Sequence, residues 1–338
     1  MFKTLIKVFI FTLLCFAMIE LSYRVYAVGA TAFHPARFNS LNLLMRSGLI
    51  QRSQYPSVFY ELKPNLDTWF QGVRFTTNSV GMADQEYQLE KPENTFRVAV
   101  VGSSWTMATS VEQEYTFHSI LEDELSGASE NWNYEFLNFG VEHYGLRELV
   151  GTTKHRVLKW DPDLILFGIT AFSGYLRWDE PTGNEELPDR TYPLFQSYAL
   201  RAFDRDNNLG IYKHAVLSRQ ILASTTDGLY EAQVIRALNE LHNISVENNV
   251  PVIVMWLSYR NPGEEIEAAL QAASTELDMI YLQAYKSLLG ADNLARKLQT
   301  GRFDKHPNKK AHERLSRSIK AVMIENELLP EKQLSSGL

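Results

Sequence analysis

The sequence predicts an α/β domain with a parallel sheet of about five strands and helices on both faces, preceded by one N-terminal membrane helix. Short apolar runs rich in β-branched residues alternate with helical periodicities between residues 96 and 325. Such alternation is typical of a parallel sheet whose two faces are both covered. An apolar run also follows two lysines at the N-terminus, and the 45% hydrophobic composition of the 338 residues can bury a sizeable core.

Composition excludes several classes of protein and site. The net charge of -7 argues against nucleic acid as a partner, because phosphate binding needs clustered Lys and Arg. The single cysteine, Cys15, excludes an internal disulfide and a Cys-rich metal site. No His or carboxylate cluster has metal-ligand spacing, and no glycine-rich phosphate loop is present. We therefore expect no metal and no cofactor.

The N-terminus, residues 1–30, is typical of a signal anchor. Lys3 and Lys7 precede an uncharged apolar run over residues 8–19, which is shorter than the roughly 20 residues that a membrane span needs. A span over residues 5–26 becomes long enough if the Lys7 side chain snorkels to the interface.

A cleaved secretory signal is the alternative, with a cleavage site near residues 28–30. Glu20 and Arg24 separate that site from the apolar run, which favours a retained single-pass anchor. The anchor places the main domain on the periplasmic or extracytoplasmic side of the cytoplasmic (inner) membrane. A buried helix of a cytosolic protein remains the third interpretation.

Downstream of the anchor, the pattern predicts an extension, a main domain and a tail. Residues 31–95 are aromatic and loop-rich, with short strands expected at 58–62 and 73–77 and a turn at 78–81, so they form an extension packed on the main domain. The main domain covers residues 96–328 and contains an insertion over about 172–226. That insertion is either a substrate-binding element or a surface elaboration without function. Residues 329–338 form a polar tail.

The strands of the main domain are expected at residues 96–102, 134–141, 163–169, 250–257 and 279–282, and its helices at 116–126, 146–158 and 230–247. Ligands of parallel sheets bind at the carboxyl ends of the strands. We therefore expect residues 102–106, 140–145 and 168–172 to converge on one site.

Three residues suggest nucleophilic catalysis. Ser104 lies on a predicted strand-to-helix turn, where a hydroxyl is raised above the sheet edge, but a serine needs a base to become a nucleophile. His306 can serve as that base, and Asp304 is close enough in sequence to orient it. His312 follows on the next predicted helix, where we expect a structural role.

The same residues resemble the conserved blocks of the SGNH (GDSL-type) hydrolases. Val-Val-Gly-Ser-Ser-Trp-Thr-Met-Ala at residues 100–108 is similar to the first block, and Asn-Phe-Gly at 138–140 to the second. Residues 162–171 stand where the third block is expected, and Asp-Lys-His-Pro-Asn at 304–308 resembles the last. A lead-in common in membrane-anchored bacterial members is matched at 77–81. The resemblance covers about residues 96–325 and implies a flavodoxin-like, three-layer SGNH fold.

The resemblance also implies roles for individual residues. Ser104 takes the nucleophile position, with His306 as its base and Asp304 as the orienter of that base. The oxyanion hole would consist of the N–H groups of Ser104 and Gly140, with Thr170 where the family has asparagine. Loss of one oxyanion donor typically costs about a hundred- to a thousandfold in rate.

Four further side chains are candidates for binding substrate. Ser103 stands where the first block usually has aspartate, and Trp105 and His143 follow predicted strand ends. Trp178 lies in the insertion. Structural or solvated roles remain open for these residues, because Trp commonly packs and a strand-end histidine is commonly solvated.

The sequence therefore predicts a membrane-tethered serine esterase or O-acyltransferase with an acylated glycan, or another small ester, as its substrate. A Gly-Ser-Ser first block is similar to that of membrane-tethered acyl-transfer members such as the D-alanylation protein of Gram-positive bacteria. Polysaccharide biosynthesis proteins are possible partners. The alternative is a catalytically impaired SGNH-like scaffold that binds a glycan or an envelope assembly partner. A soluble cytosolic hydrolase is a third interpretation.

Overall fold

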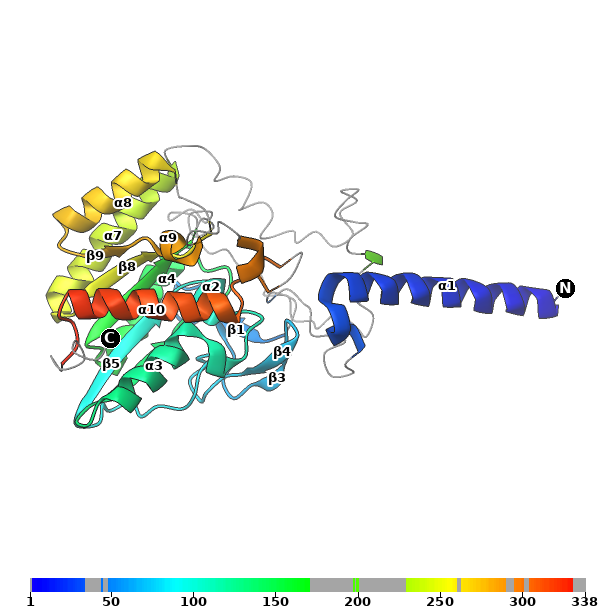
Figure 1. The fold of residues 1–338 in the computed structure, drawn as a ribbon, viewed down its shortest axis with the longest axis horizontal. Helices are drawn as coiled ribbons and strands as arrows, with labels where there is room; N and C mark the ends of the chain where they lie inside the picture. Colours follow the sequence, from blue (N-terminus) through cyan, green and yellow to red (C-terminus); the bar gives the residue numbers. More distant parts are fainter. Residues whose placement is uncertain are drawn as a thin grey trace.

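The computed structural model describes residues 2–33, 44, 48–170, 197, 199–200, 229–259, 263–289, 295–300 and 304–330. Its centre is a parallel sheet in the order β6-β5-β7-β8-β9 (Figure 1). Counted in chain order within this sheet, the strands run 2-1-3-4-5, the flavodoxin-like order. The strands are β5 (Thr95–Val101), β6 (Asn133–Asn138), β7 (Leu164–Ile169), β8 (Val252–Trp256) and β9 (Ile280–Leu282). The predicted fold class is confirmed, and each strand begins within a few residues of its predicted start.

Helices cover both faces of this sheet and complete three layers (Figure 1). One face carries α4 (Leu146–His155), α7 (Leu229–Asn248) and α8 (Glu264–Glu276); the other carries α3 (Phe117–Ala128), α9 (Ala284–Leu289) and α10 (Lys309–Glu325). All seven residues of β5 are buried, because its side chains meet helices on both sides. The helix expected over 146–158 ends earlier, at His155, and the chain continues as a 3₁₀ turn over Val157–Trp160.

The extension forms two antiparallel hairpins whose apolar side chains join the core of the α/β domain. β1 (Ile50–Arg52) pairs with β2 (Tyr60–Leu62), and β3 (Asp67–Phe70) pairs with β4 (Val73–Thr76). The predicted strands correspond to β2 and β4. The predicted turn is also present: Gly81 has φ +78° and donates its N–H to the Asn78 carbonyl at 3.1 Å. A Cβ at Gly81 would lie 2.5 Å from the Leu62 carbonyl oxygen, so the turn requires glycine.

The N-terminal helix α1 (Phe2–Val28) extends away from the α/β domain (Figure 1). Its segment Phe2–Tyr26 contains an 18-residue window with a mean hydropathy of 2.1 and no buried residue, so the helix is long and apolar enough to cross a membrane. A retained anchor and a signal sequence both fit this helix. Near its end, Arg24 Nε lies 2.6 Å from Glu20 Oε1. Most of the predicted insertion, including Trp178, and the tail from residue 331 lie outside the described residues.

A buried arginine joins the sheet to the extension. Arg97, on β5, is fully buried, and its Nε donates to Glu135 Oε2 at 2.7 Å on the edge strand β6. Its Nη atoms donate to the carbonyls of Gln88, Leu89 and Trp160 at 2.8–3.1 Å. One guanidinium therefore satisfies three backbone acceptors from two connecting segments, as well as the carboxylate.

Arg97→Ala should lower the free energy of unfolding by about 3–5 kcal/mol, because it leaves the Glu135 carboxylate buried without its partner. Chemical denaturation of the full chain in detergent micelles measures this change. Arg74→Ala is the matched control, since Arg74 and Asp67 form an ion pair whose side chains are more than 60% exposed. Equal losses in the two variants would contradict the role of Arg97.

Candidate active site

The helix that carries Ser104 packs directly on the end of β5. α2 (Ser104–Met107) begins three residues after the end of β5, and the Ser103 carbonyl accepts the N–H groups of Thr106 and Met107 at 3.0 and 2.9 Å. A Cβ at Gly102 would lie 1.9 Å from Thr106 Oγ1, so only glycine permits this approach. Ser104 is the first residue of the helix and is half-buried. The chain therefore places Ser104 just beyond the carboxyl end of β5.

The second predicted block, at the end of β6, is fixed by Asn138. The buried Asn138 donates its backbone N–H to Asp84 Oδ2 at 2.8 Å and its side-chain amide to the Ala83 carbonyl at 3.1 Å. Its Oδ1 accepts the Gly140 N–H at 2.9 Å. The Gly140 N–H, expected in the oxyanion hole, is thus engaged by Asn138 in this structure. Gly140 also packs against α2, since a Cβ there would lie 2.4 Å from Met107 N.

Thr170 brings the end of β7 to the same place. Its Oγ1 lies 3.5 Å from Ser103 Oγ, and both hydroxyl-bearing residues are buried. The Thr170 carbonyl accepts a hydrogen bond from Tyr230 OH of α7 at 3.1 Å. Two sequence-predicted residues at the ends of neighbouring strands therefore meet beside Ser104.

Asp304 and His306 form a short hydrogen-bonded pair. Their Oδ1 and Nδ1 atoms are 2.5 Å apart, and Asp304 Oδ1 also accepts the His306 backbone N–H at 3.0 Å. Burial opposes the charged form of each residue. For Asp304, the hydrogen bonds and charge of His306, with a 2.8 Å hydrogen bond from Ser110, outweigh burial and hold the pKa well below its usual value. For His306, the hydrogen bond and charge of Asp304, with the charge of Glu142, raise the pKa.

Two contacts bring this pair to the neighbourhood of α2. Ser110, three residues beyond α2, donates to Asp304 across 194 positions of sequence. The ring of Trp105, next to Ser104, lies 4.7 Å from the ring of Tyr259. Burial and the Asp304 charge both raise the pKa of Tyr259, so this aromatic pair adjoins the loop of the base. Within the described residues the Ser104 hydroxyl makes no hydrogen bond to His306, whose ring bonds to Asp304.

The other two histidines singled out from the sequence, His143 and His312, do not bond to Asp304 or Ser104 among the described residues. His143 has φ +67°, and its Nε2 lies 3.2 Å from Glu142 Oε1. His312, on α10, is fully buried and accepts the Phe117 N–H at 3.1 Å, so it joins α10 to α3. Over the residues that the structure describes, no group of three His, Cys, Asp or Glu side chains could hold a metal ion.

Sequence reasoning missed three residues around this site: Ser110, Glu142 and Tyr259. Ser110 and Tyr259 carry no local signal, because only the tertiary structure brings them to Asp304 and Trp105. Glu142 had a usable signal, since it lies two residues after the second block.

Comparisons with known proteins place ester hydrolases among the matching structures. No family model matches the sequence, and no curated protein matches it. TesA matches at 14% identity over 69% of this chain and 99% of its own, with a TM-score of 0.41. A putative lipolytic protein of the G-D-S-L family from Desulfitobacterium hafniense matches at 12% identity over 67% of this chain and 98% of its own, with a TM-score of 0.41. Axe2, an acetylxylan esterase from Geobacillus stearothermophilus, matches at 13% identity over 67% of this chain and 93% of its own, with a TM-score of 0.42. At identities of 12–14% and TM-scores of 0.41–0.42, these similarities assign neither a family nor an activity to this chain.

Two carboxyl groups, of the buried Asp84 and the half-buried Glu122, support β6 beside the site. Asp84 accepts the Asn138 N–H, and Glu122 Oε2 accepts the Phe136 N–H at 2.7 Å and Tyr87 OH at 2.8 Å. Burial, with the charge of Glu122, raises the pKa of Asp84 to about 8. Burial also raises the pKa of Glu122 to about 7. These carboxyl groups satisfy N–H groups along the edge strand that no neighbouring strand can accept.

The raised pKa values make stability depend on pH. The folded protein holds protons on Asp84 and Glu122 that the unfolded chain releases near their ordinary values of 3.8 and 4.5. The two protonated carboxyl groups therefore contribute their full stabilisation of the fold below the unfolded-state pKa values, and this stabilisation is lost as the pH rises through about 7 to 8.

We expect the thermal unfolding midpoint to fall as the pH is raised from about 7 to 8, by up to about 3–5 °C per pH unit for one linked proton, because the buried His118 and His312 are mostly neutral in both the folded and the unfolded chain over this range. Asp84→Asn should flatten this dependence, while Glu86→Gln, which removes a nearby exposed carboxylate, should leave it unchanged. Differential scanning calorimetry across the pH series measures the slope. A wild-type midpoint that rises between about pH 7 and 8 would contradict the assignment.

Proposed function

We propose that this chain is a membrane-tethered, SGNH-type serine ester hydrolase or O-acyltransferase. The observation that carries the proposal is the Asp304–His306 hydrogen bond, held beside the helix of Ser104 by the bond from Ser110. A carboxylate on Nδ1 fixes the imidazole tautomer and leaves Nε2 free to act as a base. The flavodoxin-like sheet and the order of the sequence blocks support the same chemistry.

In the proposed reaction, Ser104 Oγ attacks the ester carbonyl carbon while His306 Nε2 takes its proton. Asp304 stabilises the resulting imidazolium, which then protonates the departing alkoxide and leaves an acyl-serine. In the second half, His306 takes a proton from the attacking group, whose oxygen adds to the acyl carbon; the bond between that carbon and Ser104 Oγ then breaks, and His306 returns the proton to Oγ. Water as the attacking group gives hydrolysis, and a sugar hydroxyl gives acyl transfer.

The proposed oxyanion donors are the N–H groups of Ser104 and Gly140 and the Thr170 hydroxyl. To act as a donor, the Gly140 N–H must leave its hydrogen bond to Asn138 Oδ1 and donate to the substrate oxyanion instead. A threonine hydroxyl gives one hydrogen bond from a short side chain, so it suits an acyl carbonyl held close to β7. We therefore expect a small acyl group.

We propose that the substrate is an acylated cell-envelope glycan or polymer. The apolar helix α1 would hold the α/β domain at the outer surface of the cytoplasmic membrane, where such polymers lie. Ser103, Trp105 and His143 are the proposed binding residues among those described, with Trp178 of the insertion as a further candidate.

A fluorophosphonate probe should label the wild-type chain, and Ser104→Ala should abolish labelling because the nucleophile is gone. His306→Asn should slow labelling by about a hundredfold or more, the usual contribution of a general base. Mass spectrometry of the labelled peptide in the full chain, held in detergent, makes the measurement. Ser79→Ala, at an exposed serine bonded to Glu86, is the matched control. A folded wild-type chain that resists the probe would favour the non-catalytic scaffold.

A C-terminal alkaline phosphatase fusion should be active in a bacterial host, because this reporter folds only outside the cytoplasm. A cytoplasmic fluorescent reporter at the same position should stay dark if export uses the general secretory route. An inactive phosphatase fusion at normal expression would reject the external placement. Carbonate extraction then separates a retained anchor, which stays with the membrane fraction, from a cleaved signal.

A further inference from the structure

Glu142 is a buried carboxylate at the carboxyl edge of the sheet that the proposed mechanism does not use. It follows the second block by two residues and is 4% exposed. Its N–H donates to Met107 Sδ at 3.3 Å on the helix of Ser104, and its carbonyl accepts Tyr60 OH at 2.5 Å. Glu142 is therefore fixed between α2 and the extension.

The carboxylate of Glu142 is only half satisfied. Its Oε1 lies 3.2 Å from His143 Nε2, while Oε2 is buried without a hydrogen-bond partner among the described residues. Leaving a buried anion without full compensation destabilises a fold. Such arrangements concentrate at functional sites, where an opposite charge forms during the reaction.

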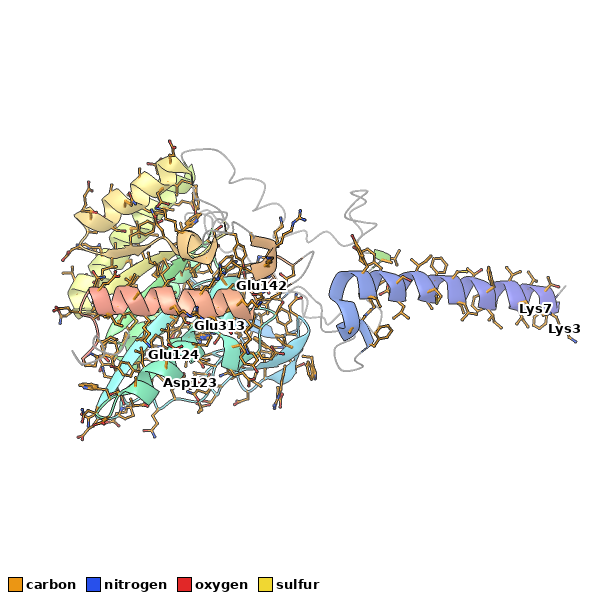
Figure 2. All side chains as sticks on the ribbon, in the orientation of Figure 1. Lys3, Lys7, Asp123, Glu124, Glu142 and Glu313 are labelled. Atoms are coloured by element: carbon orange, nitrogen blue, oxygen red, sulfur yellow. The ribbon has the colours of Figure 1, made fainter. Side chains whose placement is uncertain are left out.

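His306 is the group on which that charge would form. Glu142 lies at the same edge of the domain as the first turn of α10, directly after the His306 loop (Figure 2). Its charge acts on His306 from the β6 side, while Asp304 acts on Nδ1 from within the loop. On the α10 side the neighbour is His312, a buried neutral imidazole that supplies no compensating anion.

We propose that Glu142 is a positioning residue of the acid–base pair, a second anion beside Asp304 that stabilises the His306 imidazolium formed when Ser104 loses its proton. This role rests on the proposed function. It accounts for a buried carboxylate held rigidly by Met107 and Tyr60 with one oxygen unsatisfied. His143, a candidate for binding substrate, would also support Glu142, because its imidazole contacts the other oxygen.

The test is the pH profile of fluorophosphonate labelling for the full chain in detergent. Labelling needs neutral His306, so its rate rises with pH through the His306 pKa. Glu142→Gln keeps the shape and removes the charge, and it should move the midpoint to lower pH by about 0.5–1 unit and lower the plateau rate. Glu142→Asp keeps the charge and should retain a midpoint close to the wild type.

Glu148→Gln is the matched control. Glu148 is a buried carboxylate six positions after Glu142, and the charges that shift the His306 pKa are those of Asp304 and Glu142. Its midpoint should equal that of the wild type. NMR titration of ¹³C-labelled histidine, with the His306 signal assigned through His306→Asn, gives the same midpoint without any reaction. Circular dichroism melting shows that each variant is folded.

A labelled, folded Glu142→Gln chain with the wild-type midpoint would overturn this inference and leave the proposed function intact. Absence of labelling in the wild type would overturn the proposed function itself, and with it the catalytic role of Glu142. An unchanged His306 titration in Glu142→Gln would reject the interaction in either case.

Discussion

The parallel register of β5 with its two neighbours is the constraint on which the candidate site depends. Val100 pairs with Asn138 of β6, and Val101 pairs with Phe167 of β7, so the three strands end at nearly the same height. The backbone continues this pairing beyond the strands, since the Val141 N–H donates to the Gly102 carbonyl at 3.1 Å. A slip of one residue would turn the β5 side chains to the opposite face, and the two cores on either side of the sheet forbid it.

The extension, as well as the sheet, holds the segments at the carboxyl edge of the sheet in place. Asp84 fixes the Asn138 backbone, and Asn138 in turn fixes the N–H of Gly140. Tyr60 and Glu142 join a hairpin of the extension to the segment after β6. Residues upstream of the sheet therefore define the position of a glycine that we propose as an oxyanion donor.

Charge at the site is arranged around one imidazole. His306 meets Asp304 through a direct hydrogen bond and Glu142 through a longer-range interaction, both of which raise its pKa against the effect of burial. The nearby His118 and His312 are buried, and burial, with the charge of a neighbouring histidine, lowers the pKa of each to about 3. The fold thus keeps two histidines neutral between α3 and α10 while it favours charge on the third.

The sequence by itself determined the layers, the strands and the chemical types at the strand ends. Continuous β-branched runs identify buried strands because both sheet faces are covered. Gly102 and Gly140 mark places where α2 packs closely on the strand ends, through the Thr106 side chain at Gly102 and through the α2 backbone at Gly140. The pairing of Asp304 with His306 is local, so their spacing of two residues sufficed to predict it. The apolar helix at the N-terminus also follows from composition alone.

Only the tertiary structure decided which distant groups surround these residues. Ser110 reaches Asp304, Tyr259 reaches Trp105, and Glu142 lies unsatisfied near His306, although no periodicity or motif connects them. The engagement of the Gly140 N–H by Asn138 is likewise invisible in sequence, because a side-chain rotamer decides it. Packing brings such groups together through long-range contacts, and the burial that sets their pKa values exists only once the chain has folded.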